Sequence, residues 1–85
     1  MVAIRVELYT RRGCHLCDDA KAVLLGLRAE RCFELLETDV DSSYALQEAY
    51  GLLVPVVVVD GQRFSELRVT EPARAALRRR LEGVR

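Results

Sequence analysis

Apolar and polar positions follow two different periods in the first third of the chain. Between Val2 and Tyr9 an aliphatic residue occupies every second position, which is the period of a β-strand with one buried face. After Gly13 the apolar residues recur at steps of three and four, and this spacing predicts an amphipathic helix that starts near Cys14. The residues that form this stripe are Leu16, Ala20, Val23, Leu24 and Leu27.

The middle of the chain predicts a second strand and a short helix. The segment 32–38 holds Phe33, Leu35 and Leu36, and the aspartates and serines that follow it favour a turn and a helix N-cap. We expect this helix over 43–50. It should end at Gly51, because glycine suits the left-handed position beyond a helix C-terminus.

The last third of the chain predicts a hairpin and a final helix. Four consecutive valines over 56–59 have no polar face, so this strand is expected to be buried on both sides. Asp60-Gly61 is a tight-turn signal that leads into a fourth strand over 63–69. Thr70 is a suitable N-cap for a helix that has Pro72 in its first turn.

The predicted order of elements is β-α-β-α-β-β-α, and residues 1–85 are expected to form one domain. A strand–helix–strand opening requires a parallel pair with a right-handed crossover, whereas the hairpin adds an antiparallel pair. The sequence therefore predicts an α/β fold with a four-stranded mixed sheet and three helices, which are available for both faces of the sheet. The segment after the first strand lies at the carboxyl end of that sheet, where chemistry usually takes place.

Charge and composition exclude several classes of partner. Thirteen basic and thirteen acidic residues cancel, so no overall field attracts nucleic acid or an anionic membrane. The longest apolar stretch, Leu52 to Val59, has eight residues and contains a proline, whereas a membrane span needs about 20. No signal-peptide core follows the N-terminus. Three cysteines do not form the disulfide framework of a secreted protein, so we expect a cytoplasmic location.

The candidate chemistry belongs to Cys14-His15-Leu16-Cys17, at the junction of the first strand and the first helix. Unpaired amides and the positive end of the helix dipole favour a thiolate at Cys14. Cys17 falls one turn later, so its sulfur can reach Cys14 and displace a mixed disulfide. In this hypothesis Cys14 attacks and Cys17 resolves. His15 acts either as a charge partner for Cys14 or as an exposed spacer.

The segments LYTRRGCHLCDDAKAVL and LLVPVVVVDG resemble the glutaredoxins, within the thioredoxin-like superfamily, and the similarity spans nearly the whole chain. The resemblance implies a thioredoxin-like fold with Cys14 as the exposed nucleophile and Cys17 as the resolving residue. It implies that Pro55 forms a cis peptide bond facing the sulfurs, so that the backbone of Val54 can pair with a bound peptide or glutathione. It also implies that Arg11 lies near the glycine carboxylate of glutathione.

Two departures from the glutaredoxin pattern bear on the substrate. Leu53 stands where the family usually has threonine, and the stretch 65–68 reads Ser-Glu-Leu-Arg in place of a glycine pair and an aspartate. The loss of the glycines removes a close backbone approach, and Glu66 repels a carboxylate, which puts the usual glutathione site in doubt. The Cys-His-Leu-Cys centre resembles that of a set of small glutaredoxin-like proteins.

These observations predict a thiol–disulfide oxidoreductase that exchanges protein or glutathione mixed disulfides. We expect a monomer that requires no cofactor, with glutathione as an optional co-substrate and a disulfide-containing protein or glutathione as its partner. The residues that carry this prediction are Cys14 and Cys17 as the catalytic pair and Arg11, His15, Val54 and Pro55 at the substrate.

Two other functions stay open on the sequence alone. One is a metal or iron–sulfur cluster carrier in which Cys14 and Cys17 bridge two chains, and the other is a redox-inert binding module. A metal site within one chain needs four ligands, and we expect none here. Cys32 is predicted to begin the second strand as a buried residue far from the pair.

Overall fold

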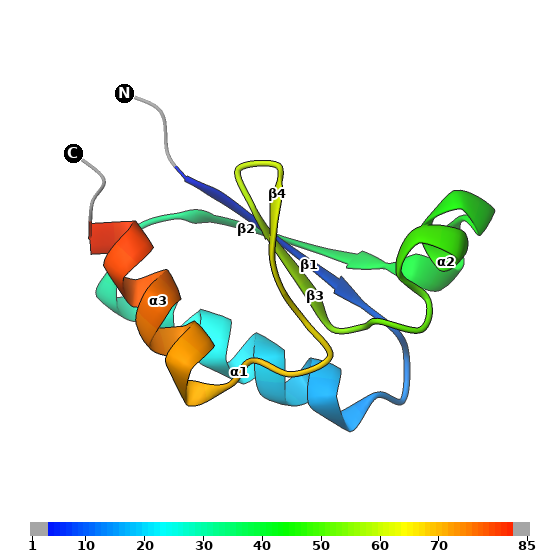
Figure 1. Ribbon diagram of the computed structural model, residues 1–85, viewed down its shortest axis with the longest axis horizontal. Helices are drawn as coiled ribbons and strands as arrows, with labels where there is room; N and C mark the ends of the chain where they lie inside the picture. The colour runs from blue at the N-terminus through cyan, green and yellow to red at the C-terminus, as the bar shows by residue number, and fades with distance from the viewer. Residues whose placement is uncertain (1–3, 83–85) are drawn as a thin grey trace.

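The computed structural model describes residues 4–82, so the first two positions of the predicted first strand, Val2 and Ala3, lie outside the described residues. Within this range, four strands and three α-helices follow the predicted order (Figure 1). The elements are β1 (Arg5–Thr10), α1 (His15–Glu30), β2 (Glu34–Asp39), the short 3-10 helix η1 (Val40–Ser42), α2 (Tyr44–Tyr50), β3 (Val56–Val59), β4 (Gln62–Glu66) and α3 (Glu71–Glu82).

The four strands form one mixed sheet, as predicted, and their order in the sheet is β2-β1-β3-β4. β1 is parallel to β2 and antiparallel to β3, and β3 is antiparallel to β4. Tyr9 lies opposite Thr38 on one side and Val56 on the other, and Val56 lies opposite Glu66. The ends of β1, β2 and β4 therefore meet the start of β3 along a single edge of the sheet.

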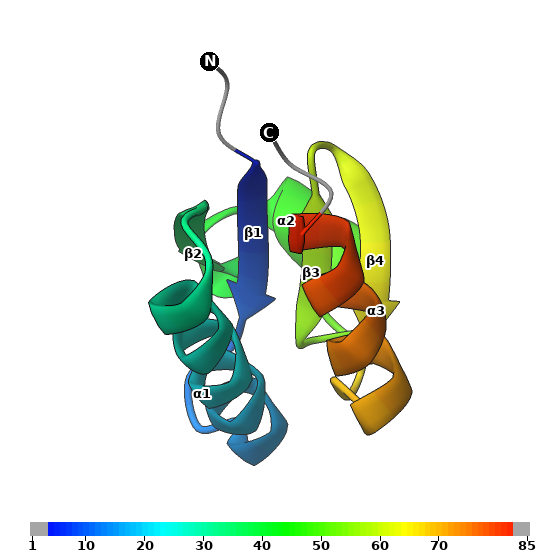
Figure 2. The same cartoon turned by 90° about the vertical axis from the view of Figure 1, so that its left-hand side faces the viewer.

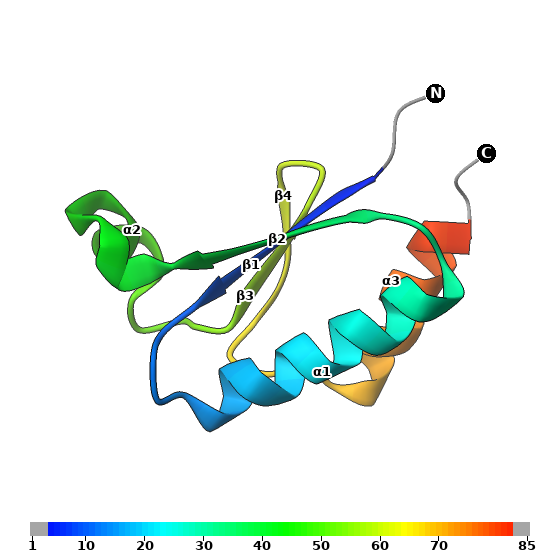
Figure 3. The same cartoon turned by 180° about the vertical axis from the view of Figure 1, so that it is seen from behind.

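Helices α1 and α3 pack side by side on one face of the sheet (Figure 2). The expectation of helices for both faces is only partly right. α2 has seven residues, none of them buried, and lies at the end of the strands (Figure 3). Because so short a helix cannot cover a sheet, α2 meets the second face through Tyr50, whose ring stacks on Tyr9 at 4.4 Å. The core between α1, α3 and the sheet comprises Ile4, Val6, Leu8, Ala20, Leu24, Leu27, Phe33, Val57, Val59, Leu77 and Leu81.

The local signals in the second half of the sequence are mostly confirmed. All four valines of β3 are buried. Asp60 and Gly61 both have positive φ, as a two-residue turn of type I′ requires. The Thr70 hydroxyl accepts a hydrogen bond from the Ala73 amide at 3.3 Å and so caps α3. β4 ends earlier than predicted, because Leu67 has a φ of 67° and leaves the extended region.

The predicted conformation of Gly51 is wrong. Its φ of −54° and ψ of −36° are those of a right-handed helix, not of the left-handed position. A Cβ atom at this position would lie 2.5 Å from the Gln47 carbonyl oxygen and 3.3 Å from Nη2 of Arg11. Glycine is therefore required by the close approach of these groups.

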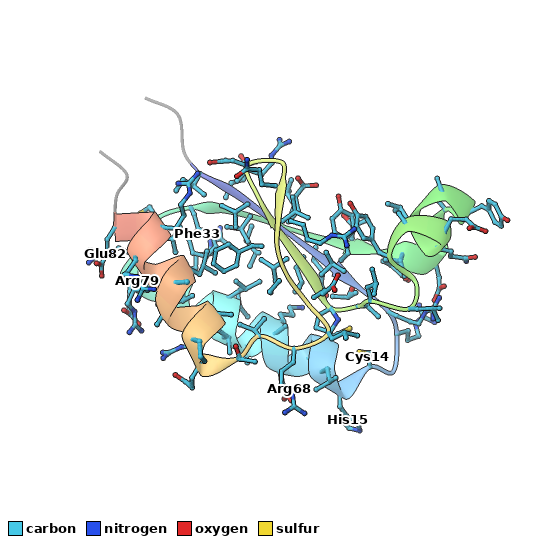
Figure 4. All side chains as sticks on the ribbon, in the orientation of Figure 1. Cys14, His15, Phe33, Arg68, Arg79 and Glu82 are labelled. Carbon is cyan, nitrogen blue, oxygen red and sulfur yellow. The ribbon has the colours of Figure 1, made fainter. Side chains whose placement is uncertain are left out.

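The predicted burial of Cys32 is also wrong, because Cys32 is exposed in the connection that precedes β2. The neighbouring Phe33 is 5 % exposed and fills the core beneath the end of α3 (Figure 4). Successive residues of an extended segment point in opposite directions, so burial of Phe33 directs Cys32 toward solvent.

No helix within residues 4–82 is long and apolar enough to cross a lipid bilayer.

Candidate active site

Cys14 is the N-cap residue of α1 and a half-buried free thiol. Its backbone is extended, and the preceding Gly13 has a φ of 75°, a conformation that glycine adopts at no steric cost. The Cys14 sulfur accepts a hydrogen bond from the Cys17 amide at 3.2 Å. One of the amides left unpaired at the start of the helix is thus directed at this sulfur, where it stabilises negative charge.

Cys17 lies one helical turn further on and is 3 % exposed. Burial raises the pKa of its thiol to about 12, and its hydrogen bond with the Cys14 side chain acts in the same direction. A hydrogen bond from the Arg11 main-chain amide acts in the opposite direction and lowers this pKa. The Cys17 thiol is therefore protonated at neutral pH, and it is more deeply buried than Cys14.

His15 is the first residue of α1 and is exposed. Its side chain points away from the sheet, on the outer side of the site (Figure 4). It therefore does not lie on the buried side that Cys17 occupies.

The Arg11 side chain is directed at η1. Its Nη2 and Nε atoms donate to the two carboxylate oxygens of Asp41 at 3.0 and 3.2 Å, and the Gln47 side chain donates to the same carboxylate at 3.3 Å. Asp41 was not expected as a partner of Arg11. The signal for it is that Asp41 follows β2, whose end lies beside the end of β1 in a parallel pair.

The peptide bond between Val54 and Pro55 is cis, as the resemblance implied. The pairing of Tyr9 with Val56 places this bond beside the loop that connects β1 to α1, which carries Cys14. The Leu67 amide donates to the Leu53 carbonyl at 2.9 Å and ties the β4–α3 connection to the same segment.

The stretch 65–68, which stands where the glutaredoxins have a glycine pair, includes one residue with a positive φ. Leu67 has a φ of 67°, in the region that favours glycine. Glu66 forms an ion pair with Arg63 at 3.1 Å. The backbone at Leu67 thus has a conformation that glycine adopts readily, but a leucine side chain and a carboxylate stand where the glutaredoxins have glycines.

An open pocket of about 410 Å³ lies between the β1–α1 loop and the end of β2. Cys17 lines it, together with charged residues of the β1–α1 loop, the start of α1 and β2. Its lining includes Arg11, Arg12, Cys17, Asp18, Glu37 and Asp39. Glu37 is held by Lys21 of α1 at 3.0 Å. Among residues 4–82, no three His, Cys, Asp or Glu side chains are grouped in a way that could hold a metal ion.

Comparison with known proteins identifies the family of this chain. The model of the Glutaredoxin-like domain family (DUF836) matches residues 5–82. Uncharacterized proteins of Mycobacterium bovis and Mycobacterium tuberculosis are 35 % identical over 72 residues, which cover 79 % of this chain and 74 % of theirs.

Solved structures show the same fold. A Nitrosomonas europaea protein superposes with a TM-score of 0.76 at 25 % identity and covers 91 % of this chain and 93 % of its own. A protein from X. campestris gives 0.70 at 32 % identity, with 94 % and 99 % covered. A mutant thioredoxin from Halobacterium salinarum gives 0.67 at 25 % identity, with 94 % and 73 % covered.

The sheet order, the cysteine at the start of α1 and the cis proline beside it define a protein with the thioredoxin-like fold that carries a pair of cysteines one helical turn apart. The chain belongs to the Glutaredoxin-like domain family.

Proposed function

We propose that this protein is a thiol–disulfide oxidoreductase that works through Cys14 and Cys17. The observation that carries the proposal is the asymmetry of the two sulfurs one turn apart. The Cys14 sulfur is accessible and accepts a hydrogen bond from a helix amide, whereas Cys17 is buried and protonated. An accessible nucleophile beside a protected second thiol is what a two-step exchange requires.

In the first step the Cys14 thiolate attacks a disulfide R–S–S–R′. The Cys14–S–R bond forms, the S–S bond of the substrate breaks, and R′ leaves as a thiolate. In the second step the Cys17 sulfur attacks Cys14, the Cys14–Cys17 bond forms, and the R thiolate leaves with the proton that Cys17 releases. The substrate gains two electrons, and the protein is left with a disulfide that a thiol reductant such as glutathione reduces again.

The substrate lies, in this proposal, between His15 and the segment of Val54 and Pro55. The backbone of Val54 pairs with the substrate in strand fashion. We expect no resident cofactor, because the protein's own Cys14 and Cys17 thiols supply the two electrons and become a disulfide. A disulfide-containing protein or glutathione serves as the partner, and the protein acts as a monomer. A reducing cytoplasm supplies the thiols that this cycle consumes.

The test is equilibration of the protein in glutathione redox buffers, followed by mass spectrometry of the intact chain. Wild type should form the Cys14–Cys17 bond, and Cys17→Ser should accumulate a glutathione adduct on Cys14. Cys14→Ser should form neither at this site. All variants carry Cys32→Ser, because that exposed thiol would otherwise form its own adduct. Equal adducts in Cys14→Ser and Cys17→Ser would contradict the assigned roles, and the absence of an intramolecular bond would contradict the function.

A further inference from the structure

Arg11 contacts two parts of the molecule in two different ways. Its guanidinium binds both oxygens of Asp41, which lies 30 positions further along the chain in η1. Its main-chain amide is directed at the sulfur of Cys17. Arg11 and Cys17 also line the same pocket.

We propose that Arg11 is a positioning residue for Cys17: its ion pair with Asp41 fixes the β1–α1 loop to η1 and holds the Arg11 amide at the Cys17 sulfur. This inference rests on the proposed exchange reaction and deepens it. It also gives Arg11 a role that differs from the contact with a substrate carboxylate implied by the resemblance. A guanidinium already bound to Asp41 through two hydrogen bonds would have to break both to bind such a carboxylate.

The ion pair matters because the loop has space beside it. The pocket of about 410 Å³ is lined both by the loop and by Glu37 and Asp39 of β2. On the other side, Nη2 of Arg11 lies so close to Gly51 that a Cβ atom there would be 3.3 Å away. Asp41 thus holds the guanidinium against the end of α2, and without Asp41 the loop can relax into the pocket.

The step that depends on this amide is the second one, in which negative charge develops on the Cys17 sulfur. The Arg11 amide opposes the groups that disfavour this charge. Asp18 on α1 raises the pKa of Cys17, and Glu37 and Asp39 approach the same pocket from β2. Arg12 is the other cationic residue of the pocket lining. A hydrogen bond from a fixed amide stabilises a thiolate without adding a side chain that would block the pocket.

The experiment measures the two steps separately with 2,2′-dithiodipyridine, an uncharged disulfide that releases an absorbing thiol at each step. In a Cys32→Ser background, the first equivalent reports the attack by Cys14 and depends on reagent concentration. The second reports the closure by Cys17 and does not. Asp41→Asn should slow the second phase by roughly tenfold, the size expected for weakening one hydrogen bond to a charged group, and leave the first unchanged.

Three comparisons separate positioning from a general loss of structure. Glu30→Gln removes a different exposed ion pair, with Arg78, and should change neither phase. The rate of the second phase against pH should be displaced to higher pH in Asp41→Asn, because the thiolate is less stabilised. The exchanged pair Arg11→Asp with Asp41→Arg should recover much of the second-phase rate, since it restores the ion pair with reversed charges.

The outcomes distinguish this inference from the proposed function. A wild-type protein that releases no second equivalent contradicts the exchange reaction itself. If wild type shows both phases and Asp41→Asn leaves the second phase unchanged, the positioning role is wrong and the exchange reaction stands. If Asp41→Asn makes the first phase faster with oxidised glutathione but not with the uncharged reagent, the freed guanidinium binds a substrate carboxylate, and this result would overturn the positioning role.

Discussion

Helix α1 has a cysteine near each of its ends, and the two sulfurs meet opposite ends of the helix dipole. Cys14 caps the N-terminus, where the Cys17 amide donates to its sulfur at 3.2 Å. Cys32 follows the C-cap residue Arg31, whose own amide is bonded to the Leu27 carbonyl at 2.8 Å. The first end of the helix presents N–H groups to a sulfur, whereas the second presents carbonyl groups.

The groups that surround the N-terminal and C-terminal ends of α1 also differ. At the N-terminal end, Cys17 and Arg11 line one pocket, and the Arg11 side chain forms an ion pair with Asp41. At the C-terminal end, α1 is joined to α3 by exposed ion pairs, such as that of Glu30 with Arg78 at 3.1 Å. The two cysteines therefore differ in the helix end beside them and in the groups that surround them, and the proposed function assigns the nucleophile to the N-terminal one.

The largest expected effect contrasts the two ends directly. Cys14→Ser should lower the rate at which the protein catalyses disulfide reduction by glutathione by several orders of magnitude, because the nucleophile is lost. Cys32→Ser should leave that rate unchanged. A coupled assay that follows the loss of a small mixed disulfide measures both. Comparable losses in the two variants would show that the helix ends do not differ in the way that the dipole predicts.

Much of this arrangement follows from local sequence. The alternation in β1, the glycine before Cys14 and the three- and four-residue steps after it are short-range signals, and they place the nucleophile at the helix N-cap. Long-range partners are harder to predict from sequence. The residues around Arg11 do not indicate Asp41, which becomes a candidate only when the ends of β1 and β2 are placed side by side. Which side of a short connection faces the core is also set by packing, so Phe33 and not Cys32 became buried.

The second prediction tests whether the two ends depend on the middle of the helix. Leu24 is fully buried in the core, whereas its neighbour Leu25 is 46 % exposed. Leu24→Ala should lower the free energy of unfolding by about 2–5 kcal/mol, because it leaves a cavity. Leu25→Ala should change it by less than about 1 kcal/mol. Chemical denaturation followed by circular dichroism measures both.

At a temperature where Leu24→Ala is still folded, its catalysed exchange rate should equal that of wild type. This result would show that the N-terminal end keeps its geometry while the packing weakens. A rate that falls in proportion to stability would mean instead that the site and the core behave as one unit. The geometry at the N-terminal end of α1 would then depend on the packing of the core and not only on the hydrogen bonds at that end.

The smallest expected effect concerns the protonation of Cys17. Burial raises the pKa of this thiol from an ordinary 9.0 to about 12. Between these values the folded protein binds a proton that the unfolded chain has lost, so the free energy of unfolding falls as the pH rises. The slope from one such group is at most about 1.4 kcal/mol per pH unit. Below pH 9 this group contributes no slope.

The matched variants for this measurement are Cys17→Ala and Cys32→Ser, unfolded by urea between pH 8 and 11 with a reductant present. Tyr9, whose pKa is raised to about 12 by burial and by its hydrogen bond with Glu7, contributes a similar slope above pH 10 in all of the proteins. Cys17→Ala should therefore show a shallower fall than wild type, and Cys32→Ser should follow wild type. Parallel curves for all three would mean that the thiol one turn into α1 is no more protected from ionisation than the one beyond its other end.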